Sequence, residues 1–506
     1  MGIPSLQYSG TPIFLFFLMN KRAVFHLVAT VTLVIGLAMG LCAALSFFWG
    51  DPVQAWRSLL SSSVMTAVFG AGLLFLTRGD MNLSRRDGFG VVTLGWVVAS
   101  LFGALPYILS GVIPHPVAAV FETMSGFTTT GASVLPSGDF LTLESIPRGI
   151  IFWRALTHWF GGMGVLVLCV AILPFLGVGG MQIYRAEMPG PSKDRLTPRI
   201  TTTAKLLWGV YALLTLAEIL LLKYIGGMCW FDSICHTFAT MATGGFSTRT
   251  ASVGAFNSGA VDCIVIFFMF AAGVNFSLHY YALTGKPGRY WKDPEFRFYF
   301  FFWLICGLIL TFNVWGSVYG NFLDALRTAF FQGTSILTTT GFVTADFDLW
   351  PQSSRILLVL MMFVGGCAGS TGGGIKMVRI SIMWKKVVKE MRQFMRPQAV
   401  LQVKLGGKAV EEEVVSHIVA FFTIFVLVFA LASFLMTFYT PDLETATTSV
   451  IATLGNIGPG LAAVGATHNF AAIPAPGQMI LTLCMLLGRL ELYTVLILFF
   501  PSFWKK

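Results

Sequence analysis

Long apolar runs, separated by shorter polar connections, dominate the pattern along the chain. Ten of them reach about the 20 residues that a helix needs to cross a hydrocarbon core. They cover approximately residues 23–48, 60–77, 89–110, 150–177, 204–225, 259–283, 298–318, 355–383, 413–439 and 476–500. The pattern therefore predicts an all-α, polytopic membrane protein, with half-polar stretches too short to span between some of the runs.

Composition and charge strengthen this prediction. The chain is 56% hydrophobic and 11% charged, whereas soluble domains are about 25% charged. Its net charge of +10 would suit a nucleic acid, but the basic residues gather at alternate ends of the apolar runs, as the positive-inside rule requires. The main clusters are 21–22, 78–86, 185–205, 286–297, 376–408 and 505–506. We therefore expect two cytoplasmic termini, an even number of crossings and no nucleic-acid partner, a basic nucleic-acid patch being the weaker alternative.

The termini and cysteines add little chemistry. Residues 1–20 lack a charged region and a cleavage site of the signal-peptide type, and we assign them no function. The eight cysteines form no paired C-x-x-C site, so neither zinc binding nor a disulfide framework is indicated. All eight are interpreted as small buried hydrophobic residues.

A repeat lies in four of the five outer loops. The stretches AVFETMSGFTTTG (119–131), SICHTFATMATGG (233–245), AFFQGTSILTTTG (329–341) and ATTSVIATLGNIG (446–458) align on their last glycine. Twelve and six residues before that glycine every member is small, and four residues before it every member is large and apolar: Phe127, Met241, Leu337 and Leu454. Small positions let helices approach closely in membranes. Each stretch is predicted to be a short, closely packed helix followed by an extended Thr/Gly segment; the alternative is four unrelated loops.

The repeat organises the whole chain. Non-helical backbone is tolerated at membrane depth only where protein or water covers it, and four re-entrant segments satisfy this by meeting around one pore. We therefore expect four pseudo-symmetric units of helix, re-entrant pore loop and helix, preceded by an N-terminal two-helix hairpin. The expected boundaries are 1–88 for the extension and hairpin, then 89–185, 186–290, 291–400 and 401–506 for the units.

Extended segments of this kind suit a monovalent cation. Rings of carbonyl oxygens replace the hydration shell of potassium in a selectivity filter, glycine permits the backbone angles that align the carbonyls, and threonine adds a hydroxyl. The short helices would direct their negative C-terminal ends toward the ion. Acidic residues near the helix starts either complement the positive N-terminal ends or are ordinary loop charges: Asp232, Asp324, Asp442 and Glu444.

These segments, together with HWFGGMGVLVL (158–168), GSTGGGIK (369–376) and LGRLELYTVL (487–496), resemble the Trk/Ktr/HKT superfamily of potassium transporters over nearly the whole chain. The extra N-terminal hairpin is most similar to its bacterial TrkH branch. The resemblance implies filter residues at Thr129, Thr130, Gly131, Thr243, Gly244, Gly245, Thr339, Thr340, Gly341, Asn456, Ile457 and Gly458.

The resemblance also implies potassium as the transported ion. A serine at the first filter glycine accompanies sodium transport in the superfamily, and this chain has glycine at all four positions. The fourth loop departs from the Thr-Gly pattern, so hydroxyl ligation there is in doubt while carbonyl ligation is not. Further implications are a homodimer in the bacterial cytoplasmic membrane and a cytoplasmic, TrkA-like nucleotide-binding regulatory subunit; this chain itself has no nucleotide motif.

Two features are candidates for a gate. GGCAGSTGGGIK (365–376) lacks the Gly-Lys-Ser/Thr ending of a phosphate loop and is interpreted as a flexible loop beneath the filter, the alternative being a simple kink. Its gate residues are Gly369, Ser370, Thr371, Gly372, Gly373 and Gly374. Arg489 lies within an apolar run, where a charge is expensive and therefore suggests function; the resemblance implies that it projects into the pore. Glu491, two residues on, points to a different helix face and need not be its partner, although a buried ion pair is the alternative.

Other polar groups are given less specific interpretations. His158 and His236 are expected in helix packing and hydrogen bonding rather than metal binding. The basic segment 376–408 is either a membrane-interface anchor or a docking surface. An ion-coupled secondary transporter would want intramembrane acids, for which Glu218, Glu491 and Asp262 are the candidates. A membrane enzyme would need a catalytic cluster that the Lys/Arg-rich inner loops do not offer.

Overall fold

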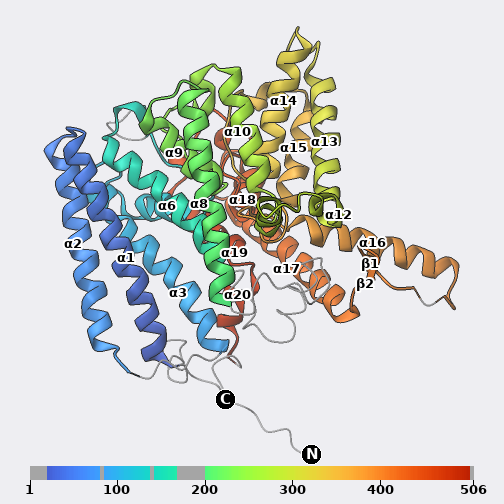
Figure 1. Ribbon diagram of the computed structural model, residues 1–506, viewed down its shortest axis with the longest axis horizontal. Coiled ribbons are helices and arrows are strands. Elements are labelled where there is room, and N and C mark those ends of the chain that lie inside the picture. The colour runs from blue at the N-terminus through green and yellow to red at the C-terminus, as the bar shows by residue number, and fades with distance from the viewer. Residues whose placement is uncertain (1–19, 80–84, 137–141, 168–199, 400, 502–506) are drawn as a thin grey trace, which may run out of the picture.

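Helices form nearly all the regular structure of the computed structural model, which describes residues 20–79, 85–136, 142–167, 200–399 and 401–501 (Figure 1). The helices are α1 (Lys21–Phe48), α2 (Val53–Leu76), α3 (Arg85–Gly103), α4 (Leu105–Ser110), α5 (Pro116–Phe127), α6 (Arg148–Val167), α8 (Ile200–Tyr224), α9 (Trp230–Met241), α10 (Gly259–Ala272), α11 (Phe276–Leu283), α12 (Arg289–Lys292), α13 (Pro294–Val314), α14 (Phe322–Leu337), α15 (Gln352–Val364), α16 (Met377–Met395), α17 (Glu412–Met436), α18 (Leu443–Leu454), α19 (Ala475–Arg489) and α20 (Tyr493–Leu496).

A small hairpin departs from the all-α prediction. Strands β1 (Lys404–Leu405) and β2 (Lys408–Ala409) pair antiparallel within the basic segment. Gly406 and Gly407 form the two-residue turn between them, with φ of 55° and 83°, which is the geometry that tight hairpins favour. The sequence analysis did not identify this Gly-Gly turn signal.

The prediction of ten runs long enough to span is wrong in detail. Among the described residues, six stretches are long and apolar enough to cross a membrane: α1, α2, α3 with α4, α8, α13 and α17. The runs 259–283 and 476–500 are instead bent pairs, α10 with α11 at 105° and α19 with α20 at 110°. The run 355–383 divides into α15, a loop and α16, and the end of the run 150–177 lies outside the described residues. The chain is nevertheless a multi-pass membrane protein.

Hydrogen bonds and backbone conformation at the breaks explain the bends. After α10 the backbone N–H of Phe276 donates to the carbonyl oxygen of Gly369 (3.0 Å) rather than within a continuous helix, and the Asn275 side chain caps the new helix at the N–H of Ser277 (2.9 Å). After α19, Glu491 and Leu492 both have left-handed backbones, with φ of 57° and 50°. Such conformations stop an α-helix.

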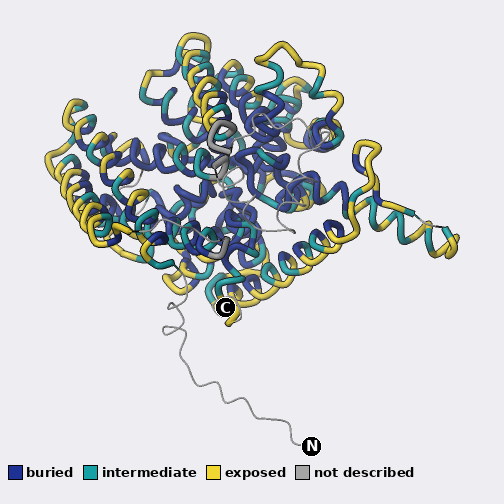
Figure 2. Tube along the Cα trace, turned by 60° about the horizontal axis from the view of Figure 1, so that its bottom comes forward, coloured by how far each residue is buried: buried dark blue, intermediate teal, exposed yellow. Residues whose placement is uncertain are grey.

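The elements surround a buried centre. Helices α1, α2 and α3 lie at one edge, α18 lies near the middle, and α16 projects away with the β hairpin (Figure 1). Buried residues concentrate in the middle, while exposed positions follow the outer helices (Figure 2). Large apolar side chains such as Leu37, Phe48 and Leu427 are more than half exposed, as expected where lipid rather than water covers the surface.

Close packing of α1 against α2 provides a test of the N-terminal hairpin. A Cβ atom added to Gly70 would lie 2.9 Å from the backbone nitrogen of Leu33, whereas one added to Gly72 would meet nothing within 4 Å. We expect Gly70→Val to destabilise the protein by about 1–3 kcal/mol, the usual cost of overpacking, and Gly72→Val to have a much smaller effect. Thermal unfolding of the two detergent-solubilised variants would measure this, and equal melting temperatures would contradict the close contact.

Candidate functional site

The four short helices of the repeat end in one common register. Helices α5, α9, α14 and α18 end at Phe127, Met241, Leu337 and Leu454, each four residues before the aligned glycine. These are the large apolar positions that the sequence alignment placed together. The threonines of the Thr/Gly segments that follow are completely buried, with 0% exposure at Thr129, Thr243 and Thr339.

The backbone after each helix repeats the same conformation. Two residues before the glycine, φ is positive at Thr129 (51°), Thr243 (55°), Thr339 (60°) and Asn456 (54°), and it is positive again at the glycines, Gly131 (82°), Gly245 (77°), Gly341 (84°) and Gly458 (106°). Left-handed backbone is uncommon outside glycine and is characteristic of functional sites. Its recurrence in all four segments indicates that one constraint acts on them together.

The backbone donors of these segments point back toward their helices. The residue just before each glycine donates its N–H to the small residue six before the glycine, at 2.8–2.9 Å, in the pairs Thr130 to Ser125, Gly244 to Ala239, Thr340 to Ser335 and Ile457 to Ala452. This gives the small position a role beyond helix packing, because its carbonyl accepts the bond that fixes the segment.

The four glycines form a closed cycle. A Cβ added to Gly131 would lie 2.1 Å from the Gly244 carbonyl oxygen, one on Gly245 2.1 Å from that of Thr340, one on Gly341 2.0 Å from that of Ile457, and one on Gly458 2.8 Å from that of Thr130. Each glycine thus packs on the equivalent carbonyl of the next unit, and the fourth returns to the first. Segments more than 300 residues apart in sequence are brought around one axis.

The side chains break this symmetry. In the first and third segments, threonine hydroxyls pair at 2.8 Å, Thr128 with Thr130 and Thr338 with Thr340. In the fourth segment, the amide of Asn456 donates to the Thr130 hydroxyl (3.0 Å) and to the Met485 carbonyl (2.9 Å). Asn456 therefore binds the first segment and α19, in keeping with the departure seen in the sequence.

The glycine-rich loop 365–376 lies against the C-terminal ends of three of these helices, α9, α14 and α18. The Thr371 hydroxyl donates to the carbonyl of Met241, the last residue of α9 (3.0 Å), and the N–H of Gly374 donates to the Gly455 carbonyl just after α18 (3.0 Å). The N–H of Gly373 also donates to the hydroxyl of Thr339 (2.6 Å). The loop therefore occupies carbonyl and hydroxyl acceptors where the helices end and the Thr/Gly segments begin. The predicted gate residues Gly369 to Gly374 all lie in this loop.

Arg489 joins the same cluster from α19. It is 4% exposed, and its guanidinium donates to the carbonyls of Thr371 (2.8 Å) and Gly161 (3.4 Å). Glu491 instead pairs with Arg379 of α16 (2.9 Å), so the inference that Glu491 need not be the partner of Arg489 is confirmed. The structure brings the two predicted gate elements into direct contact.

The sequence analysis missed two basic residues at the end of this loop. Lys376 has a left-handed backbone, with φ of 79°, and its ammonium donates to the Gly372 carbonyl. Arg379 follows one helical turn later and forms an ion pair with Glu491, which lies at the break after α19. The sequence analysis placed Arg379 only in the basic segment 376–408. It placed Lys376 there and at the end of the glycine-rich motif, and gave neither residue a role in the gate. The available signal was that both basic residues lie within the apolar run 355–383, directly after the glycines.

Of the two histidines, His236 hydrogen-bonds to the Asp232 carbonyl (2.8 Å) and the Ser247 hydroxyl (2.9 Å). His158 stacks on Phe246, with ring centroids 4.0 Å apart, and its ring fills the space that a Cβ on Gly244 would need. The expected hydrogen-bonding role is confirmed for His236 and the expected packing role for His158, whose ring nitrogens make no hydrogen bond to the described residues.

The cysteines only partly follow the prediction. Cys229 and Cys263 are exposed rather than buried; Cys229 is the residue that precedes α9, and its sulfur accepts from the N–H of Asp232 (3.4 Å). Cys169 lies outside the described residues.

Acidic residues occupy the starts of three of the four short helices, α9, α14 and α18. Asp232, Asp324 and Glu444 lie in first turns and Asp442 caps α18, accepting from the N–H of Thr445 (2.7 Å). Three of them also contact arginines: Asp232 pairs with Arg249 (2.7 Å), Asp324 with Arg327 (3.4 Å) and Glu444 with Arg355. They complement the helix dipoles, as one alternative predicted, and are in addition parts of ion pairs.

One outer carboxylate is held in its charged form. Glu144, in the short 3-10 helix Leu143–Ser145, accepts from the N–H (3.1 Å) and hydroxyl (2.7 Å) of Thr250. Partial burial acts to raise its pKa, but these hydrogen bonds and the charge of Arg249 outweigh burial, so the pKa of Glu144 lies below its ordinary value.

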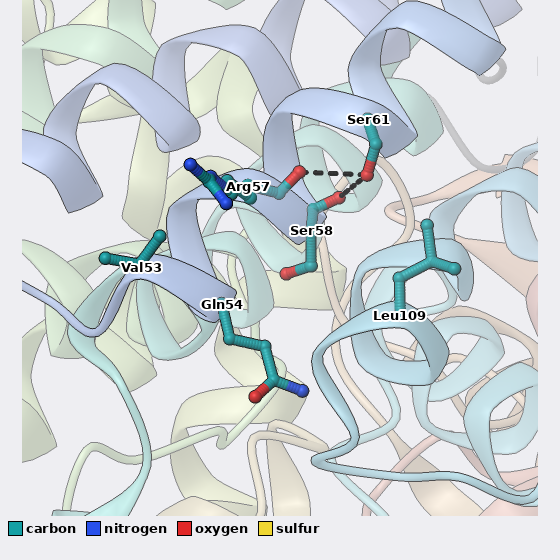
Figure 3. Close-up of a pocket in the computed structure, with 6 residues that line it drawn as sticks. All are labelled: Val53, Gln54, Arg57, Ser58, Ser61 and Leu109. Atoms are coloured by element: carbon teal, nitrogen blue, oxygen red, sulfur yellow. Dashed lines mark hydrogen bonds between the residues drawn. The ribbon is translucent and has the colours of Figure 1, made fainter.

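A surface pocket lies away from this cluster. Val53, Gln54, Arg57, Ser58 and Ser61 of α2 line it together with Leu109 of α4 (Figure 3). The Ser61 hydroxyl there bonds only to carbonyls of its own helix, those of Arg57 and Ser58. The pocket contains none of the predicted site residues, and we assign it no role.

A multi-pass helical protein in which re-entrant helices converge on a cycle of carbonyl oxygens falls into the class of cation-transport proteins. The chain belongs to the TrkH family, described as a cation transport protein, whose profile matches residues 57–506. Both the resemblance seen in the sequence and the expectation of a transporter rather than an enzyme are confirmed.

Named relatives and one solved structure cover nearly the whole chain. It is 42% identical over 496 residues to the Trk system potassium uptake protein TrkH of Salmonella typhimurium, across 96% of this chain and all of that protein. Identity to TrkH of Escherichia coli (strain K12) is 41% over the same coverage. The crystal structure of the potassium transporter TrkH from Vibrio parahaemolyticus superposes with a TM-score of 0.87 at 36% identity, over 96% of this chain and 100% of the other.

Proposed function

We propose that this protein is the membrane subunit of a potassium uptake system and that potassium crosses it through the cycle of carbonyls formed by the four Thr/Gly segments. The observation that carries the proposal is the closed contact among Gly131, Gly245, Gly341 and Gly458, each on a carbonyl of the next unit. Such a ring replaces the hydration shell of a monovalent cation. The names of the relatives, potassium uptake proteins, agree with it.

The proposed filter residues are those of the sequence analysis. The carbonyls of Thr130, Gly244, Thr340 and Ile457 form one layer, because these are the oxygens that the neighbouring glycines face. The preceding layer is formed by the carbonyls of Thr129, Thr243, Thr339 and Asn456. The helices α5, α9, α14 and α18 direct their negative ends toward this axis and so favour a cation there.

We further propose that the loop Gly369–Gly374 and Arg489 close the path beneath the filter. The loop is bonded to the inner ends of α9 and α18, and Arg489 is bonded to the loop. A guanidinium in this position places a positive charge on the ion path and repels potassium. Opening would require the loop to leave its acceptors on Met241, Thr339 and Gly455.

Partners and placement complete the proposal. We infer a homodimer in the bacterial cytoplasmic membrane, with both termini cytoplasmic, and a TrkA-like nucleotide-binding subunit on the cytoplasmic side. Support comes from α16, which projects from the body (Figure 1) and exposes Trp384, Met391 and Phe394 on one face, at 66%, 62% and 86%. The lysines and arginines of the same helix would lie on the cytoplasmic side.

Ion flux in liposomes tests the proposal and separates it from ion-coupled transport. We expect purified protein to carry potassium down its gradient at zero pH gradient and without sodium, with a reversal potential that follows potassium in mixed potassium and sodium. Flux that appears only with a proton or sodium gradient would instead establish a secondary transporter. Two of the three acids considered for coupling are in ion pairs, Asp262 with Arg327 (3.4 Å) and Glu491 with Arg379. Of the three, Glu218 of α8 is then the remaining candidate for a proton relay. Because a relay needs several acids, this favours the channel.

A further inference from the structure

A polar residue recurs at one more register of the four-part repeat. Nine residues before the aligned glycine stand Glu122, His236, Gln332 and Ser449. All four are completely buried, at 0% exposure. A polar group buried in a helix costs free energy unless it is hydrogen-bonded, so the partners of these side chains indicate what they do.

In the first two units, the partner is the chain that leaves the filter. The Glu122 carboxylate accepts from the Ser133 hydroxyl (2.9 Å) and from the N–H of Val134 (2.8 Å). The two donors, Ser133 and Val134, lie two and three residues after Gly131. His236 makes the equivalent contact in the second unit, from its Nε2 to the hydroxyl of Ser247, two residues after Gly245 (2.9 Å).

The third unit makes the same connection with a different side chain. The Gln332 amide donates to the Thr344 hydroxyl (3.3 Å) and the Ala345 carbonyl (3.2 Å), three and four residues after Gly341. In the fourth unit the connection moves by one residue. Ser449 bonds within its own helix, to Ala446 (3.1 Å), and the adjacent Thr448 hydroxyl accepts from the N–H of Leu461, three residues after Gly458 (3.0 Å).

Arg154 of α6 joins the first two of these connections. Its Nε donates to Glu122 (2.6 Å), a terminal nitrogen donates to the Ser247 carbonyl (3.0 Å), and its guanidinium lies 3.5 Å from the ring centre of Phe246. It is 3% exposed. A buried charge of this kind is retained only when it is paired and hydrogen-bonded.

We propose that Glu122, His236, Gln332 and Thr448, which we name the filter straps, are positioning residues that set the potassium-over-sodium selectivity. This inference rests on the proposed function. The inner end of each Thr/Gly segment is fixed by the N–H bond to the residue six before the glycine, and the straps fix the outer end. A segment held at both ends cannot contract around the smaller sodium ion, whereas a segment free at one end can adapt to it.

The test uses the third unit, because its strap is uncharged. In Gln332→Met the side chain keeps nearly its length but loses the amide that binds Thr344 and Ala345. We expect potassium flux in liposomes to persist and the potassium-to-sodium permeability ratio, taken from reversal potentials, to fall about fivefold or more, since one lost hydrogen bond is worth a change of this order. Thr344→Val removes the hydroxyl at the other end of the same strap and should shift the ratio in the same direction.

Thr334→Val is the matched control. Thr334 lies on the same helix and is equally buried, but its hydroxyl bonds to Trp303 of α13 (2.7 Å) and to its own helix. We expect it to lower thermal stability without changing the permeability ratio.

The outcomes separate the inference from the proposed function. If wild-type protein carries no potassium down its gradient, the proposed function fails. If the wild type is potassium-selective and folded Gln332→Met and Thr344→Val both keep its reversal potential, the straps do not set selectivity. An equal shift in Thr334→Val would show that loss of packing, and not loss of the strap, changes selectivity, and would also overturn the inference.

Discussion

Replacing Gly341 with alanine is expected to reduce potassium flux by about a hundredfold or more, or to prevent the protein from assembling. The new Cβ would lie 2.0 Å from the carbonyl oxygen of Ile457 and 2.9 Å from Cδ of Pro459. Both belong to the filter segment of the neighbouring unit, where backbone and a proline ring cannot rotate away as a flexible side chain would. The substitution must therefore displace the fourth segment, and a misplacement of the ring by even 1 Å destroys a preorganised site.

The matched control separates this clash from simple backbone strain. Gly316 has nearly the same left-handed backbone as Gly341, with φ of 78° against 84°, but a Cβ there would meet nothing within 4 Å. Gly316→Ala should therefore cost only the conformational strain of about 1–2 kcal/mol and leave flux unchanged. Size-exclusion profiles would confirm folding of each variant before flux is compared. Wild-type flux and selectivity in Gly341→Ala would show that Gly341 does not form part of the ring.

Much of this site was predictable because its signals are local. The 13-residue alignment placed Phe127, Met241, Leu337 and Leu454 in one register, and these are the residues at which α5, α9, α14 and α18 end. A position with positive φ can be recognised in the sequence because it is usually glycine, since few other residues tolerate that backbone conformation. The alignment and the need to cover non-helical backbone at membrane depth already placed the four stretches around one pore, and the family resemblance then indicated which of their residues form the filter.

The same alignment also contained the strap register, which was overlooked. The fourth letter of every repeat is polar, E, H, Q and S, yet only the small and large apolar positions were compared. Because the four residues differ in chemistry, no common residue type connected them. The common property of the first three appears only when their partners are seen on the chain after the aligned glycine; in the fourth repeat the adjacent Thr448 makes this contact in place of Ser449.

The bends could not be predicted from hydropathy. The runs 259–283 and 476–500 are apolar throughout, and composition alone does not distinguish a continuous helix from two helices at 105° or 110°. At the first break the deciding bond comes from Gly369, almost a hundred residues away, which accepts from Phe276. Tertiary contacts of this kind override local helix propensity.

The structure also connects the projecting helix α16 to the proposed gate. Lys376 and Arg379 stand at its start, the first bonded to Gly372 in the loop and the second paired with Glu491 beyond Arg489. A partner that moved α16 would therefore act on both halves of the proposed gate at once. This provides a physical route by which a cytoplasmic subunit could control flux without touching the filter.

Replacing Arg489 with alanine is expected to raise potassium flux about tenfold in liposomes that contain no regulatory subunit. The substitution removes a positive charge from the proposed path. A tenfold rise in flux corresponds to a barrier lower by about 1.4 kcal/mol, which is within the roughly 4 kcal/mol by which two unit charges about 4 Å apart interact at an effective dielectric constant of about 20. It also removes the hydrogen bond to the Thr371 carbonyl that holds the loop (2.8 Å). The potassium-to-sodium permeability ratio should stay at the wild-type value, because the filter segments keep their own bonds.

Arg489→Lys separates the two contributions. Lysine keeps the charge but is a compact ammonium without the planar fork that reaches two carbonyls, here those of Thr371 and Gly161. If charge alone closes the path, the lysine variant should conduct as the wild type does; if the bonded loop matters as well, which we expect, its flux should lie between those of wild type and Arg489→Ala. Unchanged flux in Arg489→Ala at every potassium concentration would remove Arg489 from the gate and leave the loop alone to account for closure.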